Sequence, residues 1–207
     1  MKNSLIILLL FLAGAIVGLT GIVPAEWPVA SLPKIILYVL VIQVGLSLGS
    51  GGLSVLKKEM HPAVLLVPLC TITGTLIFTA VASFLIPNRN MQECMALGCG
   101  FGYYSLSSVL ISDLKQATLG VDGAAALGAV ALLTNIVREL MALAGAPLFV
   151  KLFGKLAPVA AAGVTSMDSS LPLIKKYSGM ETVPAALVNG VVLEIATPLL
   201  VTFFCSI

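Results

Sequence analysis

Ionisable side chains inside apolar segments are the groups of this sequence that could do chemistry. Glu139 lies in the apolar segment 124–150, directly after Arg138 and four residues after Asn135. An isolated charge at the bilayer centre costs about 2.5 to 3.5 kcal/mol even on a lenient insertion scale. Arg138 and Glu139 project about 100° apart on a helix, so each needs a partner elsewhere. Two roles fit Glu139: an interhelical salt bridge that fixes packing, or a carboxylate for a substrate or a proton, which we favour.

Small and polar residues recur at helical spacing along the same segment, and they predict one closely packed face. Such a face packs on a neighbouring helix or lines a cavity, so we expect Glu139 to face protein or water rather than lipid. The residues of this stripe are Ala124, Gly128, Ala131, Asn135, Glu139, Ala142 and Ala146.

A second segment, 157–174, has a polar interruption, GVTSMDSS at residues 163–170, followed by Pro172. Proline lacks the amide that a continuous helix uses, so we predict a broken helix here. Unwound backbone at membrane depth is tolerated only where protein or a water-filled cavity satisfies it, as in transporter sites. The candidate binding residues are Thr165, Ser166, Asp168 and Ser169. The alternative is that Asp168 or Ser170 is a plain N-cap of a short interfacial helix.

A third segment, 95–112, combines glycines with hydroxyl groups. Its glycines are Gly98, Gly100 and Gly102, and they permit either close packing or a break in the helix, which the sequence leaves open. Its candidate site residues are Tyr104, Ser105 and Ser107, which offer neutral hydrogen-bonding groups to an amino or carboxyl group.

Glu194 is a further carboxylate, near the middle of the apolar segment 183–204. It lies four residues before Pro198, whose ring leaves the carbonyl group of residue 194 without its helical partner. A kink hinge and a second cation-binding carboxylate are equally good explanations.

Composition sets the class of protein. Of the 207 residues, 59% are hydrophobic and 10% are charged, whereas soluble domains carry about 25% charged residues. We therefore predict an all-α polytopic membrane protein, one transmembrane domain over residues 1–207 with no soluble domain. The expected spans are about seven, at 4–20, 33–50, 62–86, 95–112, 124–150, 157–174 and 183–204.

The charge balance and the histidine count exclude several function classes. The net charge of +2 provides no basic field for nucleic acid. His61 is the only histidine and lies beside Lys57 and Lys58 in a polar connection, which excludes a histidine-based triad and a multi-histidine metal site. We expect a protein that is not an enzyme and has no metal or cofactor.

Seven crossings would put the termini on opposite sides of the membrane. Six basic residues then fall on one side, Lys2, Lys57, Lys58, Lys115, Lys175 and Lys176, and four on the other, Lys34, Arg89, Lys151 and Lys155. The positive-inside rule predicts an N-terminus inside and a C-terminus outside.

Four motifs, in order and spacing, resemble the bacterial LysO-type lysine exporter family: GFGYYSLSS at 100–108, NIVREL at 135–140, GVTSMDSSLP at 163–172 and METVPAA at 180–186. The resemblance implies export of L-lysine and toxic lysine analogues across the bacterial inner membrane. It also implies an architecture of two inverted five-helix repeats with crossed, broken helices. An acidic residue in the family's Arg-Glu-Leu motif is implicated in transport, and it corresponds to Glu139.

The chain resembles only the C-terminal membrane part of single-chain family members. Those members carry about three further hydrophobic segments before this point, with a second important intramembrane aspartate. The start of the chain, MKN, suggests a split exporter whose missing spans lie on a small membrane partner. A homodimer is the alternative.

We therefore expect a secondary exporter of lysine or a related cationic amino acid, coupled to protons. Glu139 would bind the ammonium group or carry the coupling proton. The candidate site residues are Glu139, Asp168, Arg138, Asn135, Tyr104, Ser105, Ser107, Thr165, Ser166, Ser169 and Glu194. The alternative is a non-transporting membrane subunit whose polar helices hold a larger complex together.

Overall fold

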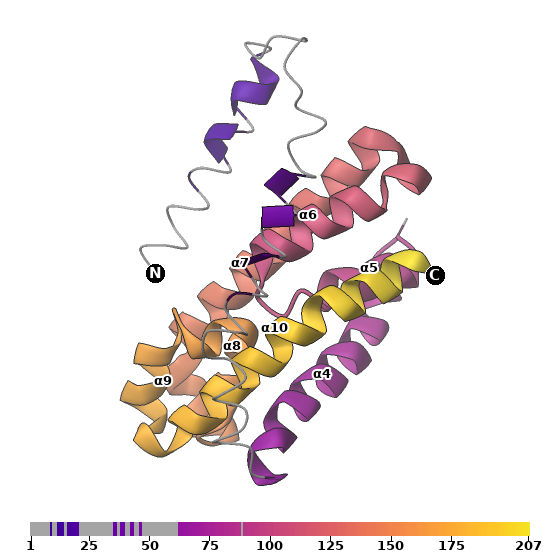
Figure 1. Ribbon diagram of the computed structural model, residues 1–207. Helices are drawn as coiled ribbons and strands as arrows, with labels where there is room; N and C mark the ends of the chain where they lie inside the picture. The colour runs from indigo at the N-terminus through magenta and orange to yellow at the C-terminus, as the bar shows by residue number, and fades with distance from the viewer. Residues whose placement is uncertain are drawn as a thin grey trace.

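The computed structural model describes residues 62–87 and 89–207, together with isolated positions between residues 9 and 46. The predicted spans 4–20 and 33–50 and the N-terminal orientation therefore lie largely outside the described residues. The described elements are α4 (Pro62–Ser83), α5 (Met91–Gly98), α6 (Tyr104–Leu114), α7 (Gln116–Phe153), α8 (Ala157–Ala162), η2 (Gly163–Met167), α9 (Leu171–Ser178), η3 (Met180–Thr182) and α10 (Val183–Ser206). This part of the chain contains no strand, as predicted (Figure 1).

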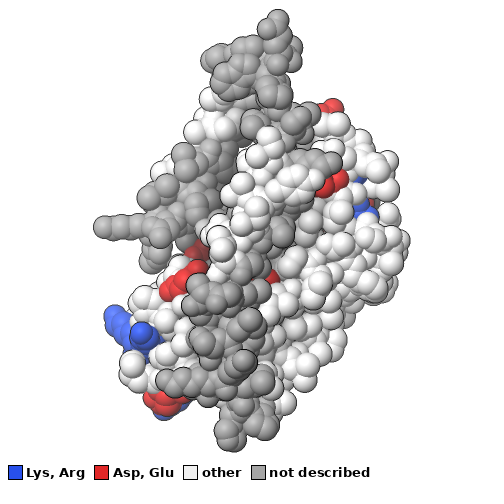
Figure 2. Space-filling view, in the orientation of Figure 1, with Lys and Arg blue, Asp and Glu red and all other residues white. Residues whose placement is uncertain are grey.

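Three of the described helices are long and apolar enough to cross a membrane: Val64–Ser83, Gln116–Phe153 and Met180–Ser206. They correspond to the predicted spans 62–86, 124–150 and 183–204. Among the described residues visible in Figure 2, most are uncharged, and the acidic and basic side chains gather in a few places. Such a surface suits contact with lipid, because a charge in hydrocarbon is costly.

The predicted span 95–112 is broken, and its two parts fold back on each other. Helices α5 and α6 are separated by a break at residues 99–103, where Phe101 has φ 45° and Gly102 has φ 90°. Glu93, at the start of α5, lines the same cavity as Lys115, which directly follows α6. Residues 91–114 therefore form a hairpin, here called the first hairpin. Helix α10 packs against both of its arms.

The predicted span 157–174 is broken, as expected, but it also folds back. Helix α8, the 3₁₀ turn η2 and helix α9 follow one another, and Pro172 lies in the first turn of α9, where the missing amide costs nothing. Lys155 before α8 and Glu181 after α9 form an ion pair, with Nζ 2.6 Å from Oε1. Residues 157–178 thus form a second hairpin, with both ends on one side.

The two hairpins meet tip to tip through their backbones. The N–H of Val164 donates to the carbonyl oxygen of Phe101 over 2.9 Å. A Cβ atom at Gly163, which has φ 65°, would collide with that same oxygen, and one at Gly102 would lie 3.1 Å from the carbonyl oxygen of Ala162. Glycine is therefore required at the tips for both conformation and space.

The long helices join opposite ends of the molecule. Helix α7 leads from the base of the first hairpin to the base of the second, and α10 returns, so that the C-terminus lies beside α5 (Figure 1). The hairpins therefore enter from opposite sides. This corrects the predicted distribution of charge: Lys115 lies with Arg89, and the second hairpin's base holds Lys151 and Lys155 with Lys175 and Lys176.

The predicted stripe of small and polar residues on α7 is confirmed. All seven of its members are buried. Glu139 consequently faces protein, as expected.

Replacing Gly163 with alanine should destabilise the fold more than replacing Gly154. Both glycines have positive φ, which costs about 1–3 kcal/mol for a residue with a side chain. Only at Gly163 does the new Cβ also meet a backbone carbonyl, whereas nothing lies within 4 Å at Gly154. Thermal unfolding in detergent should give the lowest melting temperature for G163A, a higher one for G154A and the highest for the helical control G74A. The new Cβ of G74A also has no neighbour within 4 Å. Equal stabilities of G163A and G154A would contradict the close meeting of the tips.

Candidate functional site

Asn135 of α7 hydrogen-bonds to the backbone that is exposed at the break in the first hairpin. It is 2% exposed, and its Oδ1 accepts a 2.7 Å hydrogen bond from the Gly102 N–H. Its Nδ2 donates to Ser107 Oγ over 3.2 Å and to the Ala131 carbonyl over 2.9 Å. The Ser107 hydroxyl in turn donates to the Tyr103 carbonyl. The predicted site residues Asn135 and Ser107 therefore hold the backbone of the tip.

Asn189 of α10 does the same for the second hairpin. Its Nδ2 lies 3.2 Å from the Val159 carbonyl, 3.0 Å from the Gly163 carbonyl and 3.2 Å from Ser166 Oγ. Its Oδ1 accepts from the Thr71 hydroxyl of α4 over 3.4 Å. The sequence analysis did not select Asn189. Its signal was a lone amide in an apolar helix shortly before a glutamate, the same pattern as Asn135 and Glu139.

Three hydroxyl groups complete the second tip. Ser166 Oγ can donate to the carbonyl of Gly163 at 2.7 Å or of Ala186 at 2.8 Å. Thr165 donates to the Ala162 carbonyl over 2.9 Å, and its hydroxyl lies 2.9 Å from that of Ser170. The predicted residues Thr165 and Ser166 are buried and bound to their own hairpin. They fix the unwound backbone.

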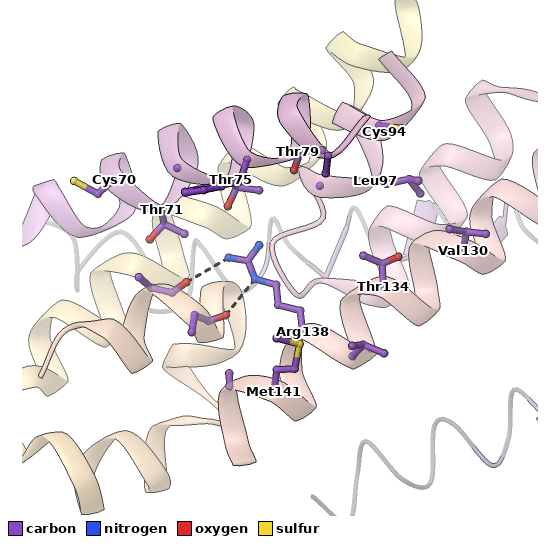
Figure 3. A pocket seen from close by; sticks show the side chains of 18 of the residues that line it. Cys70, Thr71, Thr75, Thr79, Cys94, Leu97, Val130, Thr134, Arg138 and Met141 are labelled. Carbon is purple, nitrogen blue, oxygen red and sulfur yellow. Dashed lines mark hydrogen bonds between the residues drawn. The ribbon is translucent and has the colours of Figure 1, made fainter. Parts of the chain in front are cut away.

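Arg138 closes the open end of α8. Its Nε donates to the Ala161 carbonyl over 3.1 Å and its Nη2 to the Ala160 carbonyl over 3.3 Å (Figure 3). A cation is favourable at the C-terminal end of a helix, where carbonyl groups lack helical partners. The guanidinium also lies 5.7 Å from the Phe101 ring centre. Arg138 thus binds both tips, and its predicted need for a partner other than Glu139 is confirmed.

Arg138 also lines a cavity of about 760 Å³ between α4, α5, α7 and α8. Threonines of α4 and α7 point toward it, but most of its lining is apolar (Figure 3).

Glu139 reaches the second tip from the other side of α7. It is 2% exposed, and its Oε1 accepts a 2.6 Å hydrogen bond from Ser169 Oγ. Its Oε2 is buried without a hydrogen-bond partner among the described residues. A carboxylate oxygen buried without a donor is costly, so this atom has capacity for a proton or a cation.

Asp168 and Tyr104 lie near Glu139. Asp168 is exposed at the end of η2, where its carboxylate accepts from the Ser169 N–H. Glu139 acts electrostatically on both Asp168 and Tyr104. These four residues, Glu139, Asp168, Ser169 and Tyr104, are called the carboxylate cluster below. The cluster combines a buried acid with an exposed one.

Two predicted residues lie apart from this cluster. Ser105 is half-buried in the first turn of α6, and its side chain forms no hydrogen bond with the residues that the structure describes. Glu194 is buried on α10 and acts electrostatically on Tyr103, as Asp168 and Tyr104 of the cluster also do. Tyr103 therefore lies between Glu194 and the carboxylate cluster.

Replacing Asn135 with leucine should destabilise the protein strongly. The change leaves the Gly102 N–H and the Ser107 hydroxyl without their partner, and each buried polar group left unpaired costs about 1–3 kcal/mol. The neighbouring variant T134V is a matched control, because Thr134 is exposed. Thermal unfolding in detergent should show a large loss for N135L and little change for T134V. Equal stability of the two variants would contradict the capping role.

Comparisons with known proteins identify the family of this chain. A family model described as "Lysine exporter LysO" matches residues 8–205. Lysine exporter LysO of Escherichia coli strain K12 is 26% identical over 193 residues, which cover 93% of this chain and 61% of that protein. A putative lysine exporter of Haemophilus influenzae is 29% identical over 171 residues, 83% of each chain. No solved structure matches significantly.

The family match covers nearly the whole chain, whereas the chain spans only 61% of the length of the Escherichia coli relative. The chain belongs to the lysine exporter LysO family, a family of membrane transporters rather than enzymes.

Proposed function

We propose that this chain exports L-lysine and its toxic analogues across the bacterial inner membrane, with Glu139 as the central carboxylate. The observation that carries the proposal is the buried Oε2 of Glu139, which lacks a hydrogen-bond partner among the described residues. The ammonium group of lysine would supply that missing donor. The names of the two relatives support lysine as the substrate.

The unpaired Oε2 of Glu139 also supports proton coupling. When lysine is absent, a proton on Glu139 would remove the cost of a buried negative charge. Ser169 can keep its hydrogen bond to Oε1 in both cases, since that oxygen only accepts. Proton and lysine would therefore compete for one carboxylate, which links export to proton entry.

The two hairpins support alternating access. Each hairpin is followed by a long helix with a buried asparagine, Asn135 on α7 and Asn189 on α10, and the two units run in opposite directions. Transporters of inverted-repeat architecture bind substrate where such broken helices meet near the bilayer midplane. We propose that these units belong to the two halves of a five-plus-five helix repeat.

We propose that a small membrane partner or a second copy of this chain supplies the further helices of the repeat. This chain spans 61% of the length of the Escherichia coli relative. The rest of the site would then form at the contact between the two chains.

The charges of the described residues support a C-terminus outside. Four lysines lie at the base of the second hairpin, Lys151, Lys155, Lys175 and Lys176, against Arg89 and Lys115 at the base of the first. The positive-inside rule assigns the second base to the cytoplasm. From the charges of these residues we therefore propose a C-terminus outside.

A structural membrane subunit is the second candidate. It is favoured by Asn135, Asn189 and Arg138, whose side chains all hydrogen-bond to backbone groups of the hairpins.

Lysine should raise the thermal stability of the purified protein, alone or with its partner, if the protein is a transporter. A scaffold would show no such dependence.

The variant Glu139→Gln should abolish export, because glutamine can neither carry the proton nor balance an ammonium charge. We would measure resistance to a toxic lysine analogue in an exporter-deficient bacterium, expressing the chain alone and with the small membrane protein encoded beside it. Glu181→Gln is the matched control, since Glu181 lies in an exposed ion pair. Membrane levels of all proteins would be compared.

Resistance should fall to the level of cells without the exporter in E139Q and stay near the unmodified level in E181Q. Resistance retained by E139Q at a normal membrane level would refute the assignment of Glu139.

A further inference from the structure

A second polar cavity, of about 330 Å³, lies at the base of the first hairpin, far from the carboxylate cluster along α7 and α10. It is formed by the start of α5, the junction of α6 and α7, and the end of α10. Its polar lining consists of Asn90, Gln92, Glu93, Lys115 and Thr118. Cavities near the lower end of the 300–1,000 Å³ range hold small metabolites.

Two opposite charges face this cavity from buried positions. Lys115 is 8% exposed, and its ammonium group forms no hydrogen bond or ion pair with a residue of the described ranges. Glu93 is 5% exposed, and its Oε2 lies 3.4 Å from Nη1 of Arg89. Its Oε1 has no partner within the same ranges.

Lys115 and Glu93 line one cavity without forming an ion pair with each other. Lys115 has no partner among the described residues, and Glu93 is paired with Arg89 through Oε2 alone, so a ligand that carries both charges could bind both groups at once. A simple anion would face the Glu93 carboxylate, and a simple cation would face the Lys115 ammonium group. The chemistry therefore selects a zwitterion.

We propose that this cavity binds the substrate amino acid as a zwitterion, with its carboxylate on Lys115 and an ammonium group on Glu93. The side-chain amides of Asn90 and Gln92 offer further donors and acceptors. This inference rests on the proposed function for the identity of the amino acid, L-lysine. With the C-terminus outside, the cavity lies on the release side and forms an outer binding site.

The test is equilibrium binding of labelled L-lysine and of cadaverine, the same diamine without the carboxylate, to the purified full chain. Nanodiscs made of phosphatidylglycerol alone, an anionic lipid, exclude zwitterionic lipids as competitors. The background variant Glu139→Gln removes the ammonium partner at the tips. In that background, lysine should bind roughly tenfold more tightly than cadaverine, the size of one charge-assisted hydrogen bond.

Adding Lys115→Met should weaken lysine binding roughly tenfold and leave cadaverine unchanged, so that the preference disappears. Glu93→Gln should weaken both ligands. Lys155→Met, at the base of the second hairpin, is the matched control and should change neither. Thermal unfolding of each variant would verify that it is folded.

The proposal is overturned if lysine keeps its preference over cadaverine in the Lys115→Met variant, or if that variant weakens both ligands equally. It is also overturned if only phosphatidylethanolamine, added back, stabilises the protein in a Lys115-dependent way. Because binding is measured here, the result is separate from the export assay: export retained by E139Q would refute the proposed role of Glu139 and leave this cavity standing.

Discussion

The hydrogen bond between the Val164 N–H and the Phe101 carbonyl is the contact on which the rest of the structure depends. Two breaks in helices expose backbone groups at a depth where lipid offers them no partner. The two tips satisfy part of this need by hydrogen-bonding to each other. Further exposed backbone groups are bound by the side chains of Asn135, Asn189 and Arg138. Most of the polar residues that seemed suited to a substrate are thus occupied by the backbone. What is left for chemistry is the carboxylate cluster.

Much of this could be predicted from the sequence, because local features determine it. The helices α4, α7 and α10 follow from apolar length, the buried face of α7 from its small residues, and the second break from its polar interruption and Pro172. The hairpins could not be predicted. An apolar segment with a break can either cross the membrane or turn back, and only the contacts between its two ends, Lys155 with Glu181 for example, distinguish these paths. The role of Asn189 and the cavity of Glu93 and Lys115 depend on such distant contacts too.

Two pairs of residues, each an asparagine followed by a glutamate, occupy similar positions on α7 and α10. Asn135 is followed after one helical turn by Glu139, and Asn189 is followed five residues later by Glu194. Each asparagine holds one tip, and each glutamate is buried on the same long helix. Glu139 acts electrostatically on the exposed Asp168, and Glu194 and Asp168 both act on Tyr103. The two hairpins thus each have a nearby buried acid on a long helix.

The base of the second hairpin is joined by an exposed ion pair, whereas its body is packed into the molecule. Helices α7 and α10 contact both hairpins. The arms of the second hairpin contact each other, and its base is joined by the Lys155–Glu181 pair, whose side chains are 64% and 60% exposed. An exposed pair of this kind contributes about 0–1 kcal/mol. The second hairpin is therefore held by its packing on α7 and α10 and by its hydrogen bonds to Arg138 and Asn189, and the Lys155–Glu181 pair adds little to its stability.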